Sequence, residues 1–230
     1  MIAIFSDVHG NWPALRAVLQ CIDDLGCASA ISLGDVVGYY PFVNECCEAL
    51  RSRSVVSLYG NHDHYLVSGA GCPRSKSASL CLAHQRATIA DDHFGWLSEN
   101  PRRLDFDDCS LVHGGWMDEL EEYILRPSAA YFASLPQRLF FSGHTHVQGE
   151  WKLGSKTYCN PGSVGQPRDG DWRAAFATLA GGQIRLHRVE YEVEETIECM
   201  RALAFPDAFS ANLRQGTRIG GETEGSCRSE

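Results

Sequence analysis

The first sixty residues alternate short apolar runs with amphipathic stretches. Residues 2–5 are apolar and predict a buried strand. Asn11 can cap a helix that has Pro13 in its first turn. Four apolar positions then follow the spacing i, i+3, i+4, i+7 of one helix face, namely Leu15, Val18, Leu19 and Ile22. The pattern predicts a strand followed by a helix that packs on it.

The same unit then recurs. Residues 28–33 predict a second strand, apolar positions from 43 to 50 have helical spacing, and residues 55–59 predict a third strand. Parallel strands need a crossover connection, which is usually a helix. The strand and helix order therefore predicts an α/β fold with a parallel sheet.

The second half of the chain has a different pattern of apolar and polar residues. Residues 76–100 have a helical pattern, and residues 114–137 look irregular with one short helix. Further strands are predicted at 110–112, 139–142, 156–159, 174–179 and 183–189, and a final helix at 193–204. The chain becomes polar and Gly-rich from residue 207. We therefore expect one domain over residues 1–206 and a mobile tail over residues 207–230.

Composition narrows the function classes. The 230 residues are 44% hydrophobic and 21% charged, as in an ordinary folded domain. A formal net charge of -9 argues against a nucleic-acid partner and against binding to anionic membranes. No apolar run approaches the roughly 18 residues of a membrane span, and the first residues lack the features of a secretory signal. We expect a cytoplasmic protein.

The ten cysteines contain no C-x-x-C pair, so a structural zinc site has no support. We expect reduced thiols that act mostly as small buried apolar groups.

Polar side chains follow the predicted strands at the point where each strand ends. The carboxyl ends of parallel strands lie along one edge of a sheet, where ligands bind, so residues far apart in sequence should meet there. Neighbouring glycines let the backbone turn sharply beside a bound group. The strand-end residues are Asp7, His9, Asp35, Asn61, His62, Asp63, His113, His144 and His146.

These side chains form a donor set for metal ions. Two carboxylates, one amide carbonyl and four imidazoles suit manganese, iron, nickel or zinc, and we favour manganese. Seven ligands are too many for one catalytic ion that keeps open positions. They suit two divalent ions that share a carboxylate.

The order of the motifs resembles that of the calcineurin-like metallophosphoesterase superfamily over about residues 1 to 190. The matching motifs are Asp7-Val8-His9, Gly34-Asp35, Gly60-Asn61-His62-Asp63, the lone His113 and Gly143-His144-Thr145-His146. The turn Asn160-Pro161-Gly162-Ser163 is similar to one in small single-domain bacterial and archaeal phosphodiesterase-like members. The resemblance implies a four-layer α-β-β-α sandwich of two mixed β-sheets flanked by helices. We expect the strands between 156 and 189 in the second sheet.

The resemblance also implies a role for each motif residue. Asp7, His9 and His146 would bind one metal ion, and Asn61, His113 and His144 the other. Asp35 would bridge the two ions. His62 would be the general acid of phosphate-ester hydrolysis, with Asp63 holding its imidazole in position. We favour small phosphodiesters or nucleotides as substrates, and phosphate monoesters and dinucleoside polyphosphates remain as alternatives.

Alternatives remain for the function and for two further side chains. The fold also serves non-catalytic metal-binding scaffolds and nucleases, although this chain retains His62 and every ligand. Arg168 could bind a phosphate through two parallel hydrogen bonds, or form a surface ion pair with Asp169 or Asp171. Tyr39 could contact substrate or pack its loop. Residues 64–108 and 114–137 should hold the side chains that choose the substrate. The sequence carries no signal for the oligomeric state.

Overall fold

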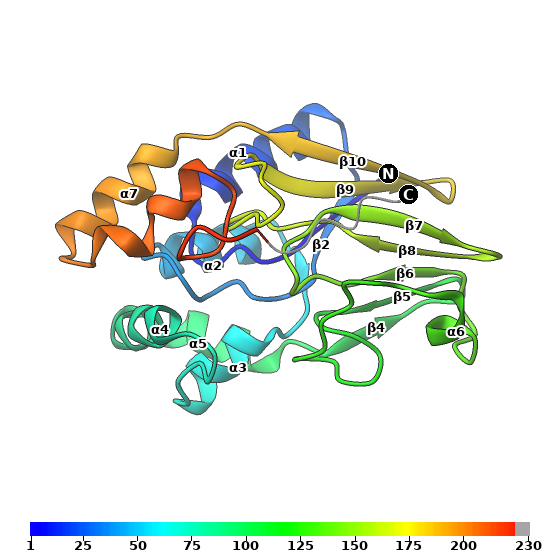
Figure 1. Ribbon diagram of the computed structural model, residues 1–230, viewed down its shortest axis with the longest axis horizontal. Coiled ribbons are helices and arrows are strands. Elements are labelled where there is room, and N and C mark those ends of the chain that lie inside the picture. Colours follow the sequence, from blue (N-terminus) through cyan, green and yellow to red (C-terminus); the bar gives the residue numbers. More distant parts are fainter. Residues whose placement is uncertain (224–230) are drawn as a thin grey trace.

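The computed structural model describes residues 1–223, which form two five-stranded sheets packed face to face (Figure 1). The first sheet has the order β10-β9-β1-β2-β3 and the second has the order β4-β5-β6-β8-β7. Both sheets are mixed and are flanked by helices, which confirms the predicted fold class.

The elements have the following bounds. The first sheet consists of β1 (Ile2–Phe5), β2 (Ser29–Ser32), β3 (Val56–Ser57), β9 (Ala174–Ala180) and β10 (Gln183–Val189). The second sheet consists of β4 (Arg103–Asp105), β5 (Cys109–Val112), β6 (Leu139–Phe141), β7 (Gly149–Leu153) and β8 (Lys156–Asn160). The α-helices are α1 (Trp12–Asp24), α2 (Val43–Ser52), α3 (Asn61–Ser68), α4 (Lys76–Thr88), α5 (Asp91–Glu99), α6 (Ala129–Phe132) and α7 (Val193–Ala202). Two short 3₁₀ helices are η1 (Asp207–Phe209) and η2 (Ala211–Arg214).

The alternation of side chains along β1 explains how the layers pack. Successive side chains of a strand point to opposite faces of the sheet. Ala3 and Phe5 face the core under the helices, whereas Ile4 faces the core between the two sheets. Phe141 and Leu111 reach that same inter-sheet core from the second sheet. The predicted parallel pairing of β1, β2 and β3 is confirmed.

The outer face of the second sheet has its own apolar cluster. Trp116, Ile124 and Phe132 cover Phe140 of β6 and Tyr158 of β8. The stretch 114–137 that looked irregular, together with the short α6, therefore supplies this covering layer.

The strands between residues 156 and 189 do not all lie in the second sheet, in contrast to the expectation from the sequence. Only β8 belongs to the second sheet, and the hairpin of β9 and β10 extends the first sheet. Strand β9 pairs antiparallel with β1, with Ile4 opposite Ala177. The physical reason is that residues 161–173 cross from one sheet to the other, which the local strand pattern does not record.

Some local predictions also need correction. The helical pattern over residues 76–100 is divided into α4 and α5, because the backbone is extended at Ile89 and Ala90. The amide of Ala90 donates to Asn44 Oδ1 (2.8 Å), which ties this break to α2. Strands β4 and β7 were not predicted from the sequence.

The segment after residue 206, expected to be a mobile tail, is packed against the domain over the described residues 207–223. Leu213 is 2% exposed and belongs to a cluster with Tyr40 and Met200. Asn212 donates to the carbonyl of Thr217 (3.0 Å), which fixes the turn that follows η2. The apolar residues of this segment are irregularly spaced, so periodicity does not reveal them. The rest of the expected tail, 224–230, lies outside the described residues.

Over the described part of the chain, no helix combines the length and hydropathy of a membrane span. The nine cysteines within residues 1–223 are all free thiols. Four of them are buried, at positions 46, 47, 81 and 159, and Cys227 lies outside the described residues.

Candidate metal centre

The structure brings all seven predicted ligands together at one edge of the two sheets. They follow strands of both sheets, and each is at most 4% exposed. Three groups of side chains place one potential ligand atom each within 4.8 Å of one another. These groups are Asp7, His9 and His146; Asp35, His113 and His144; and His9, Asp35 and His62. The first two correspond to the two predicted metal sites.

Asp35 lies between the two groups. One of its oxygens, Oδ1, accepts the backbone N–H of His62 (2.8 Å) at the start of α3. The other, Oδ2, lies 3.4 Å from His113 Nε2 and 3.8 Å from His9 Nε2. This oxygen faces one histidine from each group, as a bridging carboxylate requires.

Asp7 is held in the same manner. Its Oδ2 accepts the backbone N–H of His144 (3.1 Å). Its Oδ1 points toward His146 Nε2 (3.3 Å) and His9 Nε2 (3.8 Å). Each carboxylate is therefore fixed to the backbone by one oxygen and presents the other to the centre.

The histidines have their outer ring nitrogens on backbone carbonyls. The Nδ1 atoms of His9, His113 and His146 lie 2.9, 3.0 and 2.6 Å from the carbonyls of Val37, Leu33 and Gln166. A carbonyl only accepts, so Nδ1 carries the proton and Nε2 is directed into the centre. His9 Nε2 and His146 Nε2 face each other at 3.0 Å. Two lone pairs at this distance repel each other, and a cation bound by both nitrogens would remove that repulsion.

Buried polar atoms normally have hydrogen-bond partners. In the described part of the chain, Asp7 Oδ1, Asp35 Oδ2 and His144 Nε2 are buried without one. All three are predicted ligand atoms, and all three point into the same centre. Divalent cations that accept mixed oxygen and nitrogen ligands fit this donor set.

The backbone at these ligands is strained. Only seven described non-glycine residues have a positive φ, and five of them are predicted ligands. These are Asp7 (57°), His9 (53°), Asp35 (54°), His144 (65°) and His146 (61°). Each such residue costs of order 1–3 kcal/mol and persists only where its surroundings hold it. The strain is concentrated at the carboxyl ends of the strands, where the ligands turn inward.

Two glycines make the turns after β2 and β3 feasible. Gly34 has φ 100°, which disfavours any side chain. A Cβ on Gly60 would lie 2.1 Å from Asp35 Oδ1. The prediction that glycines permit close approach to the ligands holds at these positions.

The protonation of the histidines differs across the centre. Burial lowers the pKa of His9, His144 and His146 well below its usual value, so these imidazoles are neutral and able to bind metal. Burial also acts to lower the pKa of His113, but the adjacent Asp35 carboxylate outweighs it and raises that pKa to about 9. The geometry agrees, because His113 Nε2 lies 3.1 Å from Asn61 Oδ1 and 3.4 Å from Asp35 Oδ2.

His62 lies in the first turn of α3, with its ring against that of His9 (centroids 4.8 Å apart). It is 5% exposed and lines the pocket beside the centre. Burial lowers the pKa of His62. The predicted proton donor is therefore within the same group of side chains as the ligands.

Asp63 has a different contact from the one predicted. It does not hold the His62 imidazole, because His62 Nδ1 is buried without a hydrogen-bond partner among the described residues. The Asp63 carboxylate instead accepts three backbone N–H groups, from Asp35 (2.9 Å), Val37 (3.2 Å) and Gly60 (3.0 Å). It lies at the third position of α3, where a carboxylate satisfies free backbone donors. Asp63 therefore fixes the loop that carries Asp35.

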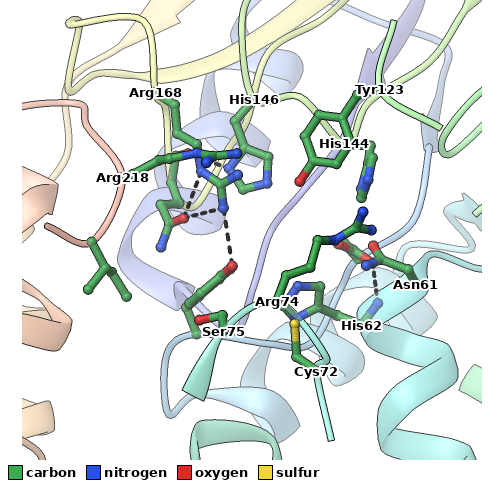
Figure 2. Close-up of a pocket in the computed structure, with 14 residues that line it drawn as sticks. Asn61, His62, Cys72, Arg74, Ser75, Tyr123, His144, His146, Arg168 and Arg218 are labelled. Atoms are coloured by element: carbon green, nitrogen blue, oxygen red, sulfur yellow. Dashed lines mark hydrogen bonds between the residues drawn. The ribbon is translucent and has the colours of Figure 1, made fainter. Parts of the chain in front are cut away.

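A cavity of ≈ 180 Å³ opens beside the centre (Figure 2). Arg168 lines it, is 5% exposed, and donates to Tyr39 Oη (3.2 Å) and Gln166 Oε1 (2.7 Å). Asp169 and Asp171, the alternative partners considered for Arg168, form ion pairs with other arginines. Tyr39 both lines the cavity and packs its ring edge on His9 (4.8 Å).

Other residues of the cavity were not predicted from the sequence. Arg74, Tyr123 and Arg218 also line it. Arg74 and Tyr123 fall within the two stretches expected to choose the substrate, but those stretches have no motif that marks individual residues. Arg218 falls in the segment expected to be a tail.

Comparison with known proteins agrees with the fold and the motifs. A family model described as the calcineurin-like phosphoesterase superfamily domain matches residues 1–181. The Methanocaldococcus jannaschii protein MJ0912 is 29% identical, over 94% of this chain and 98% of its own. The crystal structure of a Sphaerobacter thermophilus metallophosphoesterase has 32% identity and a TM-score of 0.80, over 94% of this chain and 99% of that one.

A second solved structure, PH1004 from Pyrococcus horikoshii OT3, has the same fold with a TM-score of 0.84 at 19% identity, over 94% of this chain and 99% of its own. The family model covers most of the chain, including every predicted metal ligand. The chain therefore belongs to the calcineurin-like phosphoesterase superfamily, and it is a metal-dependent phosphoesterase.

Proposed function

We propose that this protein hydrolyses small phosphodiesters or nucleotides with two divalent cations. The observation that carries the proposal is the convergence of three buried ligand atoms without partners, Asp7 Oδ1, Asp35 Oδ2 and His144 Nε2. Buried carboxylate oxygens are expensive to leave uncompensated. Cations at this point would remove that cost.

The ligands divide into two sets that share one residue. Asp7, His9 and His146 would hold one cation; Asn61, His113 and His144 would hold the other, and Asp35 would contact both. Two cations supply positive charge that polarises the phosphoryl group and lowers the pKa of a water molecule. We favour manganese, although iron, nickel and zinc accept the same ligands.

The remaining side chains have roles around the phosphoryl group. His62 would donate a proton to the leaving oxygen, because an alkoxide is a poor leaving group without one. Arg168 would bind phosphate oxygens through its planar guanidinium. Tyr39 Oη, which accepts a hydrogen bond from Arg168, fixes the direction of that guanidinium.

The test is hydrolysis of bis-p-nitrophenyl phosphate and p-nitrophenyl phosphate by protein loaded with Mn²⁺, with bound metal measured by elemental analysis. We expect about two ions per chain. On a nucleotide substrate whose leaving group is an alkoxide, we expect a loss of activity of at least 10²-fold in His62→Ala, the range for general acid catalysis, and a smaller loss on the nitrophenyl esters, because p-nitrophenolate leaves without a proton. His64→Ala, two residues along the same helix, is the matched control. Equal inertness of native protein and His62→Ala would support a non-catalytic scaffold.

A further inference from the structure

The cavity beside the metal centre is rich in positive charge although the protein is acidic. Its lining includes three guanidinium groups, from Arg74, Arg168 and Arg218, and a single carboxylate, from Asp35. The whole chain has a formal charge of -9. Guanidinium groups match the geometry of phosphate oxygens. The charge of the cavity therefore favours a strongly anionic ligand.

The three arginines come from separate parts of the chain. Arg74 lies in the connection between α3 and α4, and Arg168 follows the turn at residues 160–163. Arg218 lies after η2, beyond residues 1–181 that the family model matches. The fold thus adds positive charge to this cavity beyond what the superfamily domain contains.

The arginines lie at different depths. Arg168 is 5% exposed, lines the cavity together with His62 and His146, and donates its amide to the carbonyl of His146 (3.1 Å). It is therefore beside the metal centre. The Arg74 side chain is 49% exposed and Arg218 is half-buried, so these two lie nearer the mouth of the cavity.

Arg74 is held in place on one side of the cavity. It forms an ion pair with Glu121, and its guanidinium carbon lies 5.3 Å from the centre of the Tyr123 ring. The Tyr123 ring is 4.1 Å from that of His144. Figure 2 shows Arg74 extending toward Tyr123 and His144. The Tyr123 ring therefore lies between Arg74 and His144, which is one of the predicted ligands.

Arg218 is held by the fold of the C-terminal segment. Its amide donates to the carbonyl of Glu222 (2.7 Å), and the neighbouring Gly216 accepts from the amide of Gly170 (2.9 Å). Figure 2 shows Arg218 on the side of the cavity that holds Arg168 and His146, across from Arg74. The two outer arginines therefore flank the cavity from opposite sides.

We propose that Arg74 and Arg218 bind a second phosphate group of the substrate, separate from the phosphate that is cleaved. The proposal rests on the function proposed above, which assigns Arg168 and the metal centre to the cleaved phosphate. The cavity of ≈ 180 Å³ is smaller than the 300–1,000 Å³ of pockets that enclose whole drug-sized ligands. It encloses a phosphorylated end of the substrate, and the remainder lies outside.

The test compares ligands that differ by one phosphate. Binding of AMP, ADP and adenosine 3′,5′-bisphosphate to Mn²⁺-loaded protein is measured by calorimetry in a His62→Ala background, with excess Mn²⁺ to offset chelation. We expect ADP or the bisphosphate to bind at least tenfold more tightly than AMP. Arg74→Gln and Arg218→Gln should each reduce that ratio about tenfold. Arg102→Gln, at an exposed arginine outside the cavity, is the charge-matched control.

Each outcome bears on the proposal. Equal binding of all three ligands would overturn it, as would Arg74→Gln and Arg218→Gln variants that weaken AMP and the doubly phosphorylated ligands by the same factor. A ratio that falls equally in Arg102→Gln would show a general charge effect and would also overturn it. A failure of the proposed function would give a different result. The preference for doubly phosphorylated ligands would then remain, but native protein would hydrolyse no phosphate ester.

Discussion

Replacing Asp63 by Ala separates the role that the structure gives this residue from the role that the motif predicts. The carboxylate is fully buried and accepts the backbone N–H groups of Asp35, Val37 and Gly60. Alanine would leave three buried donors without a partner. Each such donor costs about 1–3 kcal/mol. Allowing for partial relaxation, we expect a loss of roughly 3–6 kcal/mol, a large share of the stability of an ordinary domain.

The same change should weaken metal binding, because two of the three donors belong to the loop that carries Asp35. The carbonyl of Val37 also accepts from His9 Nδ1 (2.9 Å), so movement of this loop would disturb a ligand of each group. Activity should therefore fall together with the bound metal content. A residue that only orients His62 would instead lower kcat and leave stability and metal content unchanged.

The assay is urea unfolding of the metal-free protein at pH 8, above the pKa of about 7 to which burial and Asp35 raise the Asp63 carboxyl. Asp63→Asn is the graded control. The asparagine amide keeps one acceptor oxygen but turns an NH₂ toward at least one backbone donor. Asp63→Asn should therefore lower the free energy of unfolding by less than Asp63→Ala does. His62→Ala controls for the imidazole itself. Equal unfolding midpoints for native protein and Asp63→Ala, with normal metal content, would refute the reasoning.

Four further predictions concern the metal and the core. Removing metal with EDTA should lower the free energy of unfolding by about 3–4 kcal/mol for each bound ion, relative to protein with Mn²⁺ at 100 to 1,000 times its Kd, and an unchanged melting temperature would contradict this. Below a pKa of about 9 the metal-free protein holds a proton on His113, which a metal must displace. Metal affinity, measured by competition with a chelator, should therefore rise up to about tenfold per pH unit and level off above about pH 9; affinity that is constant from pH 7 to 9 would argue against it. In the metal-free protein, the His113–Asp35 pair should give stability that is complete below pH 6.5 and lost as the pH rises through about 9. Phe141→Ala, fully buried between the sheets, should cost about 3–5 kcal/mol in urea unfolding, whereas Phe106→Ala, 53% exposed, should cost under about 0.5 kcal/mol.

The sequence by itself determined the parallel strands β1 to β3 and the convergence of the seven ligand candidates. The physical reason is local. Each ligand follows an apolar run, and the ends of parallel strands share an edge of their sheet, so position along a strand predicts position within that sheet. The family resemblance implied that the two sheets pack together, and the core between them brings their ligand-bearing edges into contact. Neither the helix spacing nor the motifs required knowledge of a distant contact.

Only the tertiary structure decided which sheet β9 and β10 join, because a strand pattern does not specify its partner. It also decided the contacts of Asp63, whose carboxylate binds amides 26 to 28 residues away as well as the nearby Gly60. Arg74 and Arg218 meet at the cavity from segments without periodicity. Their meeting depends on long-range packing, through Tyr123 and Leu213, that no local pattern encodes.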